Sequence, residues 1–139
     1  QCSQPASTDP CDFVACGGVL DTIRTQRRNP GSEALHGYLM HRASEPNPVG
    51  LLGAMWIVEG LGDKMARDWA QRIAALPGIG PDATRFLSYH SANDATHMDR
   101  LYGLLDRVCR SPEVATDIEA TAVVVGRLYA LQLEEIDGD

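Results

Sequence analysis

Apolar residues recur at every fourth position in the middle of the chain, and this spacing constrains the fold more than any other feature. The pattern lies within residues 49–76 and includes Ile57, Leu61, Met65, Trp69 and Ile73. Side chains four residues apart lie along one stripe of an α-helix. We therefore predict a long helix here, with its apolar stripe packed into a core.

The rest of the chain also predicts helices. Ser32 is a candidate N-cap for a short helix through Met40, and a second long helix is expected over about residues 83–108. Ser111 followed by Pro112 is typical of a helix start, so a third long helix is expected from there to before Gly138. No strand pattern competes, and the predicted fold class is an all-α helical bundle.

Residues 1–31 differ in character from the rest. Prolines, glycines and small polar residues fill residues 1–18, which we expect to form a loop, and a short helix is expected over residues 19–26. The expected organisation is a polar arm or partial helix over residues 1–31, followed by a helical bundle domain over residues 32–139.

The charge and hydropathy of the chain argue against two classes of function. The 139 residues include 12 Lys and Arg against 19 Asp and Glu, a formal net charge of -7, which disfavours binding to nucleic acid or to anionic membranes. The longest nearly apolar run, residues 49–61, is shorter than the roughly 20 residues of a membrane span, and Glu59 interrupts it. We expect neither a nucleic-acid partner nor a membrane partner.

The four cysteines are Cys2, Cys11, Cys16 and Cys109. They lack the paired spacing of zinc sites, so we expect no metal role for them. The chain begins at Gln1 without a basic and apolar leader, which favours reduced thiols and a cytoplasmic location.

Three polar residues lie where apolar residues belong. His90, Asp94 and His97 occupy positions i, i+4 and i+7, within about 60° of one another on the second long helix. Phe86, Leu87, Leu101 and Leu104 continue the same stripe. The three side chains are therefore expected to point into the core, where each needs a hydrogen-bonding or charged partner.

Glu59 is a further polar residue in an apolar segment, because it is the only ionisable residue between Val49 and Gly62. Two helices that contribute Glu59 and the His90, Asp94 and His97 group would supply the mixed oxygen and nitrogen donors that suit iron or manganese. A buried histidine alone is more often hydrogen-bonded structure than a ligand. The four together favour a metal site, with Tyr89 and Asp99 as candidates to orient the imidazoles.

These residues resemble a known family, the heme-oxygenase-like di-iron oxidases and oxygenases, which are similar in fold to the thiaminase II group. The resemblance runs from about Leu35 to Ile136 and rests on the His-x3-Asp-x2-His motif, on Glu59 within residues 56–62, and on the closing run of residues 127–135. It implies a heme-oxygenase-like bundle, one or two iron ions with manganese as the alternative, and Glu59, His90, Asp94 and His97 as metal ligands.

The chain departs from this family near its N-terminus. Family members also take a Glu and a His from an early helix, and no such pair occurs on an apolar face in the first thirty residues. We therefore expect a bundle without the N-terminal helices, either as the C-terminal part of a longer protein or as a form that has lost a helix pair. An uncovered apolar face would then bind a second copy or the missing segment.

The function expected from this resemblance is that of a non-heme iron oxidase or oxygenase acting with dioxygen on a small organic substrate. A different class is also open, a non-catalytic helical module that binds a metal or a partner chain. A third interpretation, a metal-free enzyme like thiaminase II, needs a nucleophilic cysteine in the core, and no cysteine here fits that role.

Overall fold

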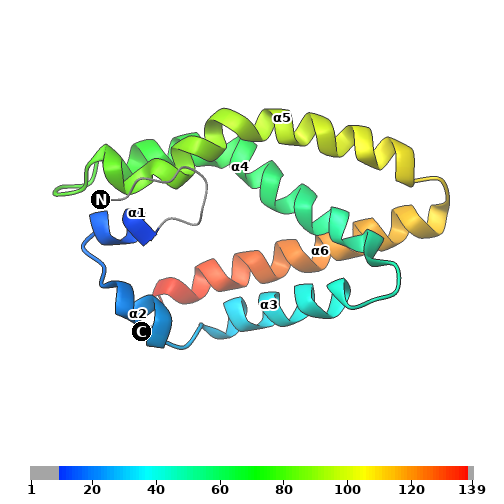
Figure 1. The fold of residues 1–139 in the computed structure, drawn as a ribbon, viewed down its shortest axis with the longest axis horizontal. Helices are drawn as coiled ribbons and strands as arrows, with labels where there is room; N and C mark the ends of the chain where they lie inside the picture. Colours follow the sequence, from blue (N-terminus) through cyan, green and yellow to red (C-terminus); the bar gives the residue numbers. More distant parts are fainter. Residues whose placement is uncertain (1–9, 138–139) are drawn as a thin grey trace. The chain divides into compact units, whose positions relative to one another are not determined.

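The structure is a computed structural model that describes residues 10–137, including all side chains there except those of Pro10, Asp94, Ala95 and Asp137. Every regular element in the described part is helical (Figure 1), which confirms the predicted all-α class. The described residues divide into two compact units, one of residues 10–26 and 61–95 and one of residues 27–60 and 96–137.

The three long helices form where the sequence predicted them. They are α4 (Leu51–Ala74), α5 (Arg85–Val108) and α6 (Pro112–Glu134). The predicted cap of α6 is confirmed, because the hydroxyl of Ser111 accepts a hydrogen bond from the Val114 N–H at 3.4 Å and Pro112 occupies the first turn. A single 3-10 turn, η1 (Pro48–Gly50), leads into α4.

The N-terminal third differs from the prediction in two places. α3 (Pro30–Ala43) begins before Ser32, and its N-cap is Asn29, whose side-chain oxygen accepts from the Ser32 N–H at 2.8 Å. Ser32 as the N-cap was therefore wrong, because Pro30 suits the first helical turn and the helix extends back to it. α1 (Pro10–Ala15) lies in the expected loop, whereas α2 (Leu20–Thr25) confirms the short helix.

The unit of residues 10–26 and 61–95 contains α1, α2, the C-terminal half of α4, the 3-10 turn η2 (Pro81–Thr84) and the start of α5. α1 packs against η2. A carboxylate oxygen of Asp12 in α1 accepts from the Phe86 N–H at 2.8 Å, and so binds one of the free backbone donors at the start of α5. The buried residues of this unit are small: Ala66, Ala70, Ala83 and Thr84.

The unit of residues 27–60 and 96–137 is built on the pairing of α3 with α6, which lie side by side (Figure 1). The side chain of Asn29 donates to the Gln132 carbonyl at 2.9 Å, which joins the start of α3 to the end of α6. The core combines residues from α4, α5 and α6. Its buried members are Ala54, Met98, Leu101, Ile118, Thr121 and Val125.

Gly53 allows α4 to approach α6 closely. A Cβ atom at this position would overlap the Ile118 carbonyl oxygen and would lie 2.8 Å from the Ala122 nitrogen. Both are backbone atoms, which cannot rotate out of the way, so a side chain would push the helices apart. This contact fixes the part of α4 that carries Glu59, six residues further along the same helix.

The cysteines differ from the expectation of four reduced thiols. Cys11 is disulfide-bonded, whereas Cys16 and Cys109 are free and exposed. Disulfides persist mainly in oxidising compartments. The cysteines therefore do not support the expected cytoplasmic location. None of the helices in the described ranges combines the length and apolar character that a membrane crossing requires.

Candidate metal centre

Glu59 and His97 meet in the unit of residues 27–60 and 96–137. The carboxylate Oε2 of Glu59, on α4, lies 3.0 Å from the imidazole Nδ1 of His97, on α5. The two residues are 38 positions apart in the sequence. Folding therefore joins two of the four residues that the sequence predicted as ligands.

A second polar contact joins the same two helices near this pair. The indole Nε1 of Trp56 donates to the hydroxyl of Tyr102 at 3.3 Å. Trp56 precedes Glu59 by one turn of α4, and Tyr102 follows His97 on α5, so both contacts fit antiparallel helices. Trp56 is 41% exposed, and its indole N–H binds Tyr102, which is exposed as well.

The Glu59 and His97 side chains are less buried than predicted. They are 25% and 34% exposed, whereas the apolar pattern had placed them inside the core. The buried residues of α4 and α5 that lie nearest to them in sequence are Ala54, Met98 and Leu101. An ion bound by the pair would therefore be reachable from solvent.

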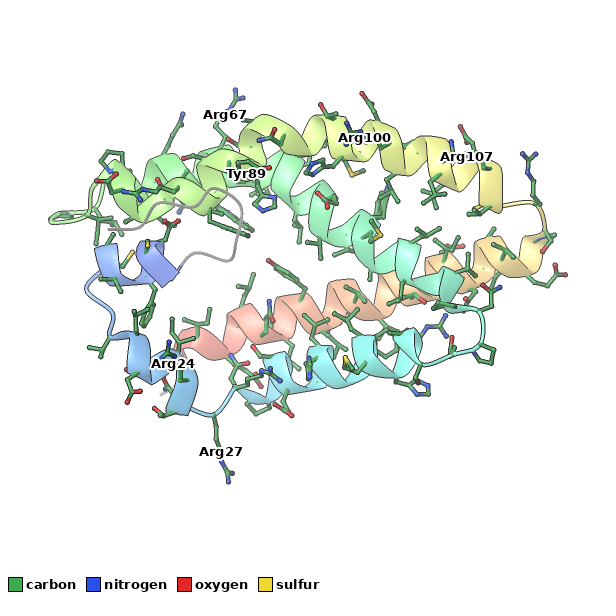
Figure 2. All side chains as sticks on the ribbon, in the orientation of Figure 1. Arg24, Arg27, Arg67, Tyr89, Arg100 and Arg107 are labelled. Carbon is green, nitrogen blue, oxygen red and sulfur yellow. The ribbon has the colours of Figure 1, made fainter. Side chains whose placement is uncertain are left out.

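His90 lies in the unit of residues 10–26 and 61–95, among aromatic rings of its own helix. Its ring centroid is 4.3 Å from that of Phe86 in a tilted arrangement, and 5.7 Å from that of Tyr89 edge to face. Tyr89 is labelled on α5 in Figure 2 and is 45% exposed. Tyr89 and His90 are consecutive residues, so the role predicted for Tyr89 stays a prediction.

The structure shows less about the other two predicted residues, Asp94 and Asp99. Asp94 lies within α5, between His90 and His97, and its side chain is outside the described part. Asp99 is exposed, and among the described residues no hydrogen bond to its carboxylate is found. Within the described residues, no three His, Cys, Asp or Glu side chains gather closely enough to hold a metal ion. The full set of four includes Asp94 and remains a prediction.

The distance between Glu59 and His97 fits two arrangements of a metal site. Two donors at right angles on one ion, each about 2.1 Å from it, are about 3 Å apart. Alternatively, the Nδ1–H of His97 donates to an ionised Glu59, which leaves Nε2 of the imidazole for the metal. The imidazole suits iron or manganese in both arrangements, and in the first the carboxylate adds an oxygen donor, so the pair is chemically compatible with the predicted ion.

The sequence did not indicate a second charged cluster, which links α3, the turn after it and α6. The guanidinium of Arg42 lies 2.5 Å from Asp117 and 2.9 Å from Glu45, and its side chain is only 14% exposed. The hydrogen bond that Arg42 donates to Asp117 raises the pKa of Arg42 above its already high value. The only indication of this cluster in the sequence was a basic residue, Arg42, near a helix end. That indication does not identify Asp117 as its partner.

Comparison with known proteins identifies no relative. No family model matches the chain, no curated protein is similar enough to match, and no solved structure matches.

Proposed function

We propose that this chain is a non-heme iron oxidase or oxygenase that acts with dioxygen on a small organic substrate. The observation that carries the proposal is the 3.0 Å approach of Glu59 to His97 from two different helices. In the sequence, both residues are polar residues within apolar helical patterns. Their convergence supports a common role for them.

This proposal rests on His97 and Glu59, and the sequence adds Asp94 and His90 as further candidate ligands. An ionised Glu59 that accepts from Nδ1–H fixes the imidazole tautomer and presents Nε2 of His97 as a donor. Asp94 and His90 lie three and seven residues earlier on α5, on the same helical face, and add a carboxylate and a second imidazole. Iron, or manganese in its place, supplies the capacity for chemistry with dioxygen when bound.

The second candidate is a non-catalytic helical module that binds a metal or a partner chain. Its support is the exposure of large apolar side chains in the described residues, among them Met40 at 59%, Met55 at 47% and Val123 at 63%. Apolar surface of this kind suits a partner, which we propose to be a second copy or an N-terminal segment. A cytoplasmic location stays a prediction beside either candidate.

Anaerobic titration with ferrous iron, followed by exposure to dioxygen, separates the two candidates. The oxidase proposal expects saturable iron binding and dioxygen consumption beyond that of free ferrous iron. His97→Ala should abolish both, and Asp106→Ala, which changes an exposed carboxylate further along the same helix, is the matched control. Iron binding without added dioxygen consumption would support the module, and no binding at all would refute the oxidase.

A further inference from the structure

The outward side of α6 carries exposed apolar residues among exposed polar residues, which include Thr116, Arg127 and Glu134. Ile118, Thr121 and Val125 are buried on the inward side. On the opposite side, Val123 is 63% exposed, Val124 is 36% exposed and Leu131 is 38% exposed. Together with the exposed Ala120 they lie within about 100° of one another around the helix. We name these four residues the α6 outer face.

Two valines on this face are costly for an isolated chain. Valine loses side-chain freedom in a helix, and in a core this loss is offset by burial. Val123 obtains little of that compensation, because most of its side chain is in solvent. Single exposed hydrophobic residues are ordinary, but four on one face of one helix form a surface typical of interfaces.

Two opposite charges frame the same face symmetrically. Glu119 precedes Val123 by four residues and Arg127 follows it by four, and both are exposed. They are about 12 Å apart along the helix, too far to pair within one chain. Neither takes part in any ion pair found among the described residues.

Antiparallel pairing with a second copy would satisfy these charges. If the two-fold axis passes near Val123, residues equally far before and after it lie opposite each other. Arg127 of each copy then faces Glu119 of the other, and the two Val123 side chains meet at the axis. A two-fold contact repeats each pairing, so both charges of each copy are paired.

We propose that the α6 outer face is a homodimer interface, formed by antiparallel packing of α6 on α6 of a second copy. One pair of helices buries less than the roughly 1,600 Å² of a typical stable interface, so the dimer is expected to dissociate reversibly at micromolar concentrations. The proposal does not depend on a bound metal. The proposal rests on exposed residues that are remote in sequence from the candidate metal centre.

Charge exchange tests the register of this pairing. In sedimentation equilibrium, Glu119→Arg alone and Arg127→Glu alone should each weaken self-association at least tenfold, because each places like charges opposite each other. An equimolar mixture of the two variants should associate again, because both interfacial pairs then become complementary. Failure of the mixture to associate, with both single variants folded by circular dichroism, would overturn the antiparallel register.

Cross-linking tests the position of the axis. In a background with Cys16→Ser and Cys109→Ser, the substitution Val123→Cys should give a covalent dimer on mild oxidation, because the two positions meet at the axis. Ala34→Cys, at an exposed position of α3, is the matched control and should stay monomeric. A monomeric wild type throughout the micromolar range, or equal cross-linking at both positions, would overturn the proposal.

Discussion

The guanidinium of Arg42 on α3 lies 2.5 Å from the carboxylate of Asp117 on α6. The two residues are 75 positions apart in sequence, and their ion pair joins the two helices. The same guanidinium binds Glu45 at 2.9 Å, one turn further along the chain. A Cβ at Gly50 would overlap the guanidinium and would lie 2.7 Å from the Thr121 hydroxyl oxygen. The glycine in η1 therefore makes room for this ion pair.

Replacing Arg42 should destabilise the fold more than replacing an arginine in an exposed pair. Arg42→Met leaves Asp117 and Glu45 close together without their cation, and we expect a loss of about 2 kcal/mol in the free energy of unfolding. Arg28→Met is the matched control, because the Arg28–Glu33 pair is 3.7 Å long and both side chains are more than half exposed. Its cost should be below about 0.5 kcal/mol. Urea denaturation measures both, and equal costs would contradict the role given to Arg42.

Alanine at two helical glycines should have opposite effects. Gly53→Ala places a methyl group against the Ile118 carbonyl and should destabilise the fold by about 1–3 kcal/mol. Gly103→Ala, in α5, meets no atom within 4 Å and should stabilise it by about 0.5–1 kcal/mol. Thermal unfolding of both variants gives the comparison. A neutral Gly53→Ala would show that α4 and α6 are not closely packed at this point.

Tyr129 should make stability fall at alkaline pH. Burial raises the pKa of its phenol above the usual value. The folded state therefore holds the proton to higher pH than the unfolded state does, and the stability from this group is complete below about pH 10. It is lost as the pH rises from there through the folded pKa. Urea denaturation across this range should show a smaller alkaline loss for Tyr129→Phe than for wild type, and parallel curves would contradict the assignment.

The boundaries of the long helices followed from sequence because their causes are local. Ser111 and Pro112 determine the start of α6 within four residues of chain, and a recurring apolar stripe is enough to identify α4. The short elements were less predictable. Asn29 and Ser32 are both good capping residues, and the choice between them depended on Asn29 also binding the Gln132 carbonyl across the fold.

The candidate site was predictable only as a set of residue types on helical faces. Spacing placed His90, Asp94 and His97 on one face, but it could not show that Glu59 binds Nδ1 of His97. That contact depends on how α4 and α5 pack against each other, which residue spacing within one helix does not determine.

Glu59→Gln should separate the roles that the geometry allows for this carboxylate. If Glu59 orients His97 or binds the ion, removing its charge should lower iron affinity by about tenfold or more. The apo protein should keep its stability, because a neutral amide is easier to bury than a carboxylate. Calorimetric titration with ferrous iron and urea denaturation of the apo protein measure the two effects. Unchanged iron affinity with a less stable apo protein would make Glu59 a structural hydrogen-bond acceptor.

The iron content of the purified protein tests the central claim most directly. After iron-replete expression, plasma mass spectrometry of the wild type should find at least one equivalent of iron or manganese per chain. His90→Ala, Asp94→Ala and His97→Ala should each lose most of this metal while helical circular dichroism is retained. A wild type with no bound metal, or with stoichiometric zinc that survives all three substitutions, would contradict the account.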